Sequence, residues 1–272
     1  MPFKDLLVVV DPGSDAAGRF AVSAARRFEA HLTAATLIVD PTTSLGYLET
    51  AAASLDSFLE EARTAAQRNL DDLARSARAS EVTIETEIAQ CGFLAIVEIF
   101  GPRLRPYDLV FAEQGCPDRP DERDLIIEAA LFGAGCPVLV VPYVHTAPFR
   151  AETVVIAWDN SGPAARAVGH SLPLLTAANR VEIVTVKDLL EGDWSPAIKL
   201  KRHLHRHGID AELHTLPGAG DVASALLSHA SNSEADLLVM GGYGHSRFRE
   251  FILGGATRGI LESMTLPVLM SH

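Results

Sequence analysis

Cysteine, aromatic residues and positive charge are all scarce in this chain. Its three cysteines, Cys91, Cys116 and Cys136, are an odd number at wide spacing. They fit neither a disulfide framework nor a metal-ligand pattern, so we expect small buried or loop residues. The formal net charge is −12. This charge argues against a nucleic-acid partner, because a phosphate backbone would be repelled.

Long apolar runs and leader segments are missing as well. Apolar stretches fall well short of the roughly 20 residues that a membrane-spanning helix needs, so we expect no membrane partner. The segment 1–10 has a short apolar run that leads into a turn and offers no small-residue cleavage site, unlike a signal peptide. We therefore expect a cytoplasmic protein.

Well-known catalytic motifs are also absent. Ser161 does not lie in a Gly-x-Ser-x-Gly elbow, so a hydrolase triad has no support. The chain has no Gly-x-x-x-x-Gly-Lys-Ser/Thr loop, which excludes a P-loop ATPase. His203, His205 and His207 lack a His-Glu-x-x-His motif and lie in a basic stretch before Gly208, where cations complement a helix end. We therefore expect no catalytic residues and no metal site.

Short apolar runs alternate with segments of helical periodicity along the whole chain. Such alternation predicts parallel sheets covered by helices on both faces. We expect Gly133 and Gly208 to end helices. The long helix predicted at 44–79 either packs on its own domain, which we favour, or forms an assembly surface. The predicted strands are 6–10, 32–39, 82–88, 108–112, 136–142, 153–157, 181–186, 211–216, 237–240 and 266–270, and the predicted helices are 15–30, 44–79, 93–100, 125–132, 163–175, 195–207, 221–231 and 256–264.

The two halves of the chain repeat several anchor sequences. Asp108-Leu-Val recurs as Asp236-Leu-Leu-Val. A Cys-Pro-Val-Leu-Val run before the middle of the chain recurs as Leu-Pro-Val-Leu-Met near its end. A repeat of this length indicates a duplicated α/β unit. We therefore predict two domains, at 1–148 and 149–272, each a five-stranded parallel sheet with helices on both faces.

A glycine-rich stretch in the second half is the most distinctive local feature. The predicted strand 237–240 ends in a cluster that includes Gly241 and Gly244, and the pair Gly254 and Gly255 then opens the next predicted helix. Glycines let a ligand approach bare backbone, and free N–H groups at a helix start attract phosphate. Glycines at a strand end are equally common as turn residues, so the cluster alone leaves both interpretations open.

The spacing of these glycines resembles the nucleotide-phosphate motif of the universal stress protein family. It reads Gly-x-x-Gly, nine residues, then Gly and a small residue. That family usually has Ser or Thr where this chain has Gly255, so a hydroxyl is missing while the backbone amides remain. The strand–helix order is also similar to the family over nearly the whole chain. The resemblance implies two tandem adenine-nucleotide-hydrolase-like (Rossmann-like) domains that form an intramolecular pseudo-dimer, with a homodimer as a further option.

Transferred position by position, the resemblance implies an adenine-nucleotide site in the second half. The ligand would be ATP, ADP or AMP, with or without Mg²⁺. An acidic residue after the first strand would face the ribose, a backbone group at the end of the second strand would contact adenine, and glycines would line the phosphates. The role of a turn residue or a helix N-cap suits Asp159 as well as the ribose contact does. The implied residues are Ala157, Asp159, Val186, Met240, Gly241, Gly244, Gly254 and Gly255.

Charge distinguishes the halves. Residues 1–148 hold 12 Lys and Arg against 22 Asp and Glu, a net charge of −10, whereas residues 149–272 hold 11 against 13, a net charge of −2. Alignment of the repeats puts the carboxylates of Glu113 and Asp124 where the second half has Gly241 and Gly254. We therefore expect the first half to bind no nucleotide and to act as a structural partner.

Charged residues around the glycine motif have two interpretations each. The segment 245–249 carries two arginines that could reach phosphate, although a solvated loop is the commoner role. Arg258 lies in the first turn of a predicted helix, where its charge opposes the helix dipole. We therefore expect Arg258 to have an anion or a carboxylate as partner.

Three functions remain open. The first is a stress-response protein that binds an adenine nucleotide, with slow ATP hydrolysis at most because no general base is evident. The second is a universal stress protein without nucleotide, which acts through a protein partner or another small ligand. The missing hydroxyl at Gly255 and the carboxylates in the first half favour this function. The third is an enzyme of a related nucleotide class, such as a pyrophosphatase, which would need Mg²⁺ ligands that the sequence does not reveal.

Overall fold

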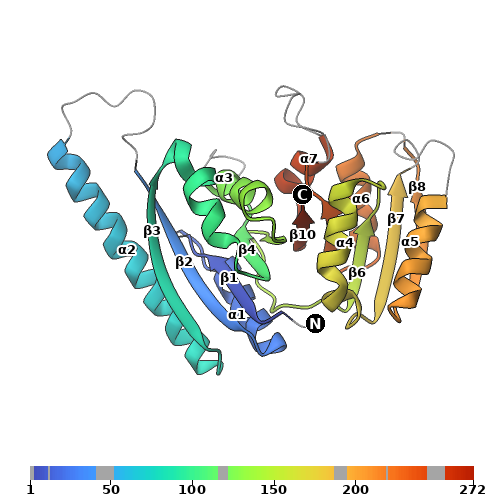
Figure 1. Cartoon of the computed structure of the whole chain (residues 1–272), viewed down its shortest axis with the longest axis horizontal. Helices are drawn as coiled ribbons and strands as arrows, with labels where there is room; N and C mark the ends of the chain where they lie inside the picture. The colour runs from blue at the N-terminus through green and yellow to red at the C-terminus, as the bar shows by residue number, and fades with distance from the viewer. Residues whose placement is uncertain are drawn as a thin grey trace. The chain divides into compact units, whose positions relative to one another are not determined.

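The structure is a computed structural model of the full chain. It describes residues 3–11, 13–40, 52–115, 122–186, 195–218, 220–243 and 255–272. Contacts between residues divide the chain into two compact units, Pro2–Phe149 and Arg150–His272. Each unit has its own parallel sheet, with strands and helices labelled in Figure 1. Among the described residues, no helix combines the length and the apolar character needed to cross a membrane.

The first unit contains a five-stranded parallel sheet. Its strand order is β3-β2-β1-β4-β5. The central strand β1 pairs on both sides, since Leu6 is in register with Leu32 and with Leu109. Its side chains are fully buried from Leu6 to Val8, as expected of a strand covered on both faces. The strands are β1 (Asp5–Val9), β2 (His31–Asp40), β3 (Ile84–Gly92), β4 (Leu109–Glu113) and β5 (Val138–Val141).

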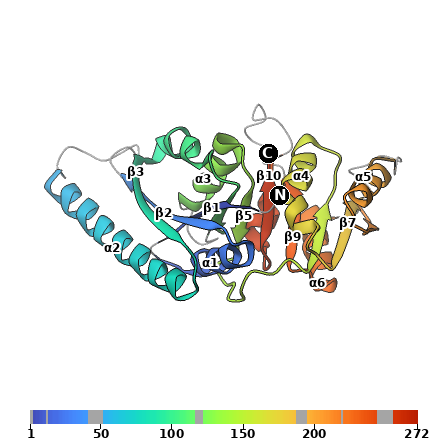
Figure 2. The ribbon, with the colours of Figure 1, turned by 60° about the horizontal axis from the view of Figure 1, so that its bottom comes forward.

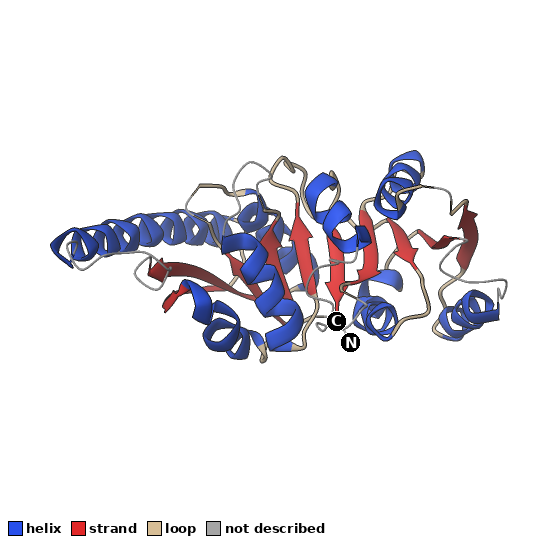
Figure 3. Cartoon of the chain, turned by 90° about the horizontal axis from the view of Figure 1, so that it is seen from above, coloured by secondary structure: helices blue, strands red, loops and turns tan. Residues whose placement is uncertain are grey.

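Helices cover both faces of this sheet (Figure 3). The helix α1 (Ala16–Phe28) packs against β1, and the long helix α2 (Ala52–Ala79) packs against β2 and β3, as Figures 1 and 2 show. The buried side chains of α2, among them Leu70 and Leu73, belong to this core. The expected packing role of the predicted helix 44–79 is therefore confirmed for its described part, and its first residues, 44–51, lie outside the described residues.

The helical segments after β3 and β4 differ from the predictions in detail. The first runs from Phe93 to Leu104 as a 3₁₀ turn, a π-helical turn and a second 3₁₀ turn, so it continues beyond the predicted end at residue 100. The second consists of α3 (Glu122–Glu128) and a π-helical turn to Ala134.

The glycine that ends this second segment is not the predicted one. The prediction that Gly133 stops it is wrong, because the left-handed residue is Gly135, with φ of 75°. Gly133 instead permits a close crossing, since a Cβ there would lie 2.9 Å from the Cα of Gly101.

The second unit repeats the topology of the first. Its strand order is β10-β9-β6-β7-β8, so β6 and β9 occupy the places that β1 and β4 occupy in the first sheet. The predicted α/β class with a five-stranded parallel sheet in each half is therefore confirmed. Gly208, with φ of 77°, follows α5 as expected. The elements are β6 (Thr153–Ala157), α4 (Gly162–Leu175), β7 (Arg180–Val186), α5 (Ser195–Arg206), β8 (Ala211–Leu216), α6 (Val222–Asn232), β9 (Leu237–Gly241), α7 (Gly255–Ser263) and β10 (Val268–Ser271).

The repeated aspartates have the same structural role in both units. In the first unit, Asp108 Oδ2 accepts hydrogen bonds from the backbone N–H groups of Lys4 at 2.7 Å and Asp5 at 3.0 Å. In the second, Asp236 Oδ2 accepts hydrogen bonds from the N–H groups of Glu152 and Thr153, both at 2.9 Å. Each carboxylate thus satisfies backbone donors at the start of the neighbouring central strand, which explains why the motif recurs.

The described cysteines are buried, as expected. They are Cys91 and Cys136, and Cys116 lies outside the described residues. Burial raises the pKa of the Cys136 thiol to about 11. This thiol therefore stays protonated at neutral pH, which makes it a packing residue rather than a nucleophile.

Candidate functional site

The candidate site lies at the carboxyl ends of β6 and β9. The strand β6 pairs with β7 on one side and with β9 on the other, as the pairs of Val154 with Val181 and with Leu237 show. The chain leaves β6 toward β7 and arrives at β9 after β8, so the strand order reverses between β6 and β9. Open α/β sheets bind ligands at the carboxyl ends of strands at such a switch point. The segments that follow Ala157 and Gly241 therefore line this edge.

The turn after β6 places Asp159 in solvent at this edge. Asp159 Oδ1 accepts a hydrogen bond from the Ser161 N–H at 2.9 Å, and Asn160 between them has φ of 62°. Ser161 is the N-cap of α4, because its Oγ accepts a hydrogen bond from the Ala164 N–H at 3.1 Å. Asp159 is thus a turn residue and not the cap. Its exposed carboxylate remains available to a hydroxyl-bearing ligand.

Gly241 has a packing role at the end of β9. A Cβ built on Gly241 would lie 2.6 Å from the Ala164 nitrogen and 2.9 Å from Pro163, both in the first turn of α4. Only a glycine permits this approach of strand to helix. The preceding side chain, Met240, is buried in the core, and so is Val186 at the end of β7. Ala157, Val186 and Met240 therefore present mainly backbone to this edge of the sheet.

The two described residues after β9, Gly242 and Tyr243, are held by hydrogen bonds to β10 and to a buried threonine of α7. The N–H of Gly242 donates to the carbonyl oxygen of Ser271 at 2.8 Å. Tyr243, with φ of 50°, donates its N–H to Thr257 Oγ1 at 3.2 Å. Thr257 lies in the first turn of α7 and is only 5% exposed. Its position just after the glycine pair is the sequence signal that could have identified it.

Gly255 is the first residue of α7. The residue is exposed, and a Cβ built on it would meet none of the described atoms within 4 Å. The N–H groups of the first helical turn have no intrahelical partner, so this helix start can accept an anion. Gly244, Gly254 and the arginines of the segment 245–249 lie outside the described residues. The structure thus brings Ala157, Asp159, Met240 and Gly241 to one edge, with Val186 on the neighbouring strand.

Arg258 has the carboxylate partner that its position predicts. Its Nε lies 2.5 Å from Glu262 Oε1, one turn further along α7. Both side chains are more than half exposed, so this ion pair contributes little to stability.

The equivalent edge of the first unit contains a network of ion pairs. Arg123, in the first turn of α3, places its Nε 2.8 Å from Asp11 Oδ2 after β1. Its NH1 lies 3.3 Å from Glu113 Oε1 at the end of β4. Burial raises the pKa of the Glu113 carboxyl, an effect that Ser14 and Arg123 oppose. These side chains occupy the switch point, where the second unit presents backbone and glycine.

A hollow that the sequence did not reveal lies beside the β6–α4 turn. It has a volume of about 380 Å³, and Trp158 and Asn160 line it together with residues of α4 and α5, including Lys199 and His203. Trp158 Nε1 is buried and has no hydrogen-bond partner among the described residues. A buried indole N–H usually has a partner, so this donor suits a polar group of a ligand.

The histidines of α5 contact other protein groups. The rings of His203 and His207 lie 4.7 Å apart, and His205 Nδ1 lies 2.9 Å from Asp210 Oδ1. A cluster that the sequence did not reveal consists of Glu182, His214 and His229, whose potential ligand atoms lie within 4.8 Å of one another. No local motif connects these three residues, which come from three different elements.

Comparison with known sequences assigns the second unit to a family. A model of the universal stress protein family matches residues 151–272. A universal stress protein of Synechocystis sp. is 33% identical over 66 residues, which cover 24% of this chain and 22% of that protein. The match thus spans about a fifth of the length of this curated relative.

Comparison with solved structures extends the likeness of fold to both units. The crystal structure of a universal stress protein from Archaeoglobus fulgidus has a TM-score of 0.71 and 16% identity, with 97% of each chain covered. A protein of Pseudomonas aeruginosa described as functionally unknown has a TM-score of 0.62 and 16% identity, with 98% of this chain and 92% of that chain covered. At such identities the likeness concerns the fold alone. The second unit, residues 151–272, therefore matches the universal stress protein family.

Proposed function

We propose that the second unit binds an adenine nucleotide and that this binding serves a stress response. The ligand is ATP, or the ADP or AMP derived from it, with Mg²⁺ as a possible companion of the phosphates. The observation that carries the proposal is the start of α7, where Gly255 is exposed and Thr257 accepts a hydrogen bond from the Tyr243 N–H just after β9. The family assignment of residues 151–272 supports the choice of ligand class.

Each part of the nucleotide has a proposed contact. The exposed carboxylate of Asp159 accepts hydrogen bonds from the ribose hydroxyls, next to Ala157. The backbone at Val186 contacts adenine. The phosphates lie along the glycine-rich segment and accept hydrogen bonds from the backbone N–H groups at the start of α7. We propose that Met240, Gly241 and Gly244 line the base, ribose and phosphates, and that Gly254 and Gly255 offer backbone amides to the phosphates.

The first unit supports this assignment by contrast. Where the second unit has Gly241, the first has Glu113, and Arg123 already neutralises that carboxylate. A nucleotide would have to displace Arg123 and then bring its phosphates close to Glu113 and Asp11. We therefore propose that residues 1–148 form a degenerate universal stress protein domain that binds no nucleotide and acts as a structural partner of the second.

Catalysis is not part of this proposal. Hydrolysis of ATP needs a group that activates water and a metal ion that stabilises the developing charge. At the carboxyl ends of the second unit's strands the carboxylates of Asp159 and Asp221 are both engaged, since Asp159 Oδ1 accepts the Ser161 N–H and Asp221 caps α6. Slow hydrolysis at most is expected, and bound nucleotide would report cellular conditions to a protein partner.

The test begins with mass spectrometry of small molecules released from the purified protein, followed by calorimetric titration with ATP and Mg²⁺. Asp159→Asn keeps the oxygen that forms the turn and removes the charge, so ATP affinity should fall about threefold to tenfold. Asp210→Asn is the matched control, since Asp210 is exposed in the same unit and precedes β8, at the opposite end of its strands. No released nucleotide and no heat at millimolar ATP would refute the proposal.

A second candidate function is binding of another small ligand. The hollow of about 380 Å³ beside Trp158 favours it, since it offers an apolar wall, an indole N–H and the charged Lys199. Gly255 favours it too, because this residue lacks the hydroxyl that the family usually offers to phosphate. Small molecules other than nucleotides in the same mass spectra would support this second function.

A further inference from the structure

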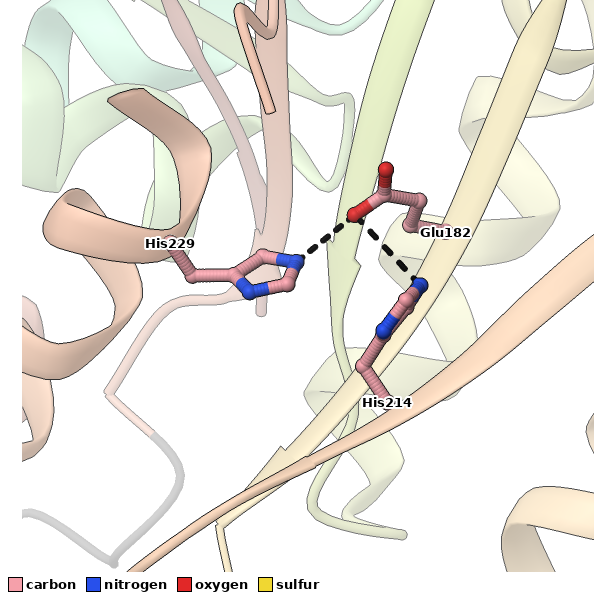
Figure 4. A group of neighbouring side chains, drawn as sticks. All are labelled: Glu182, His214 and His229. Atoms are coloured by element: carbon pink, nitrogen blue, oxygen red, sulfur yellow. Dashed lines mark hydrogen bonds and ion pairs between the residues drawn. The ribbon is translucent and has the colours of Figure 1, made fainter. Parts of the chain in front are cut away.

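Glu182, His214 and His229 converge on one face of the second sheet, as Figure 4 shows. Glu182 lies near the start of β7, His214 lies on β8, and His229 lies near the end of α6. In the parallel pair of β7 and β8, Glu182 is in register with Glu212 and Val184 with His214. Side chains alternate along a strand, so Glu182 and His214 point to the same face of the sheet. The helix α6 covers that face and brings His229 to both.

Both histidines present their Nε2 atoms to a single carboxylate oxygen. His229 Nε2 lies 2.6 Å from Glu182 Oε2, and His214 Nε2 lies 3.8 Å from the same oxygen. His214 Nε2 is buried from solvent and has no hydrogen-bond partner among the described residues. A buried ring nitrogen without a partner loses the hydrogen bond that water would give it. The cluster therefore contains a ring nitrogen that makes no hydrogen bond, with the Glu182 and Glu212 carboxylates 3.8 Å and 3.5 Å away.

We propose that Glu182, His214 and His229 form a binding site for one divalent transition-metal ion of the zinc class. Two imidazole nitrogens and one carboxylate oxygen are a donor set that zinc takes in proteins, with a fourth position left for water. Zinc at about 2.1 Å from each ligand in a tetrahedron puts the ligand atoms about 3.4 Å apart. The distances of 2.6 Å and 3.8 Å bracket this value, so small side-chain rotations complete the geometry.

The surrounding groups fix the carboxylate for this role. The Nε of Arg180 lies 3.3 Å from Glu182 Oε1, which leaves Oε2 for the metal ion. Ser233 Oγ donates a hydrogen bond to Glu182 Oε2 at 2.9 Å, so a hydroxyl that does not itself bind the ion orients the ligand oxygen. Such outer contacts orient the ligands of metal sites. Glu212 Oε2, 3.5 Å from His214 Nε2, adds a second negative charge that offsets the positive charge of Arg180.

The site is accessible from one side. Glu182 is only 4% exposed, whereas the side chains of His229 and His214 are 15% and 37% exposed. The strand β8 forms an edge of the sheet in this unit, so a movement of the partly exposed His214 side chain can admit an ion to its buried Nε2. A bound ion would connect β7, β8 and α6 directly. The cluster is also separate from the candidate nucleotide site, because Glu182 lies near the start of its strand and that site lies at the strand ends.

Zinc titration of the full-length protein tests this inference after treatment with a chelator. A chromophoric competitor measures affinity, and Co²⁺ in place of zinc reports tetrahedral nitrogen and oxygen ligands by its visible absorption. One ion per chain is expected. His214→Gln should weaken binding at least about tenfold, and it removes no hydrogen bond of the His214 ring, so the fold should persist. Glu182→Gln should weaken binding similarly and provides an independent second variant.

His203→Gln is the matched control. His203 is an exposed histidine of the same unit whose ring faces His207, so this pair is the natural place for adventitious zinc. Unchanged affinity and unchanged Co²⁺ absorption in this control support the site. Three results would each overturn the proposal: no binding at micromolar zinc, full affinity in folded His214→Gln, or loss of binding in His203→Gln.

Discussion

The start of α7 gives the sharpest prediction, because two substitutions at one position should change ATP affinity in opposite directions. Gly255 is the first residue of the helix, is exposed, and has room for a side chain among the described residues. Gly255→Ser supplies the hydroxyl that the family motif usually has. Gly255→Asp supplies a carboxylate at the same point. Both substitutions add a residue type that favours a helix start, so neither should unfold the domain.

The two substitutions should change ATP affinity in opposite directions. A hydroxyl that donates to a phosphate oxygen contributes about 1.5 kcal/mol at an exposed position, which is roughly a tenfold gain in affinity for Gly255→Ser. A carboxylate about 5 Å from a phosphate charge costs about 3 kcal/mol at an effective dielectric constant near 20. Salt screens part of this repulsion, so about a thirtyfold loss is expected for Gly255→Asp.

Calorimetric titration at two salt concentrations checks both values. Gly255→Ala is the control, because it adds a Cβ without a polar group and should stay within about twofold of the original affinity. The loss in Gly255→Asp should shrink at high salt, as repulsion between exposed charges must. Equal affinities in the Ser and Asp variants, with both proteins folded, would refute phosphate binding at this helix start.

Three further predictions concern stability and are measured by chemical denaturation. Gly241→Ala places a Cβ 2.6 Å from the nitrogen of Ala164, so the free energy of unfolding should fall by about 1–3 kcal/mol. Arg123→Ala leaves the buried Glu113 carboxylate without its cation and should cost about 3–5 kcal/mol. Burial lowers the pKa of His145 below 6.5, so the unfolded chain binds its proton first and stability should fall as the pH drops below about 6.5.

Controls separate these effects from general damage. Arg258→Ala removes an exposed ion pair and should change the free energy of unfolding by less than about 1 kcal/mol. His145→Gln should flatten the dependence of stability between pH 5 and 7, because the titrating ring is gone. An equal loss in the Arg123 and Arg258 variants, or an unchanged pH dependence in His145→Gln, would contradict the reasoning.

Periodicity along the chain was sufficient to predict most of the fold. The pattern of apolar residues identified all ten strands that the structure describes. Strands buried on both faces, such as β5, are apolar throughout, whereas β3 and β8 also carry polar residues. Local signals failed where another element decides the structure. Gly133 carries the signature of a helix stop, yet it is needed for the crossing with Gly101, and Gly135 ends the segment instead.

The sites were predictable to different degrees. Asp159 and Gly241 follow strand ends, so the rule for parallel sheets brings them to one edge without any structure. The structure adds what no local pattern contains, namely that Gly241 lies against α4 and that Ser161 caps it. Glu182 and His229 are 47 residues apart, and their contact depends on how α6 crosses the sheet.

Arg123 acts as a ligand that the chain carries within itself. A free nucleotide binds and leaves according to its concentration, whereas a tethered side chain has a fixed effective concentration and cannot be diluted away. The edge of the first unit that holds Asp11 and Glu113 is therefore in the same liganded state under all metabolic conditions. If the second unit alone exchanges nucleotide, each chain contributes one responsive unit, and its binding curve should be a simple hyperbola.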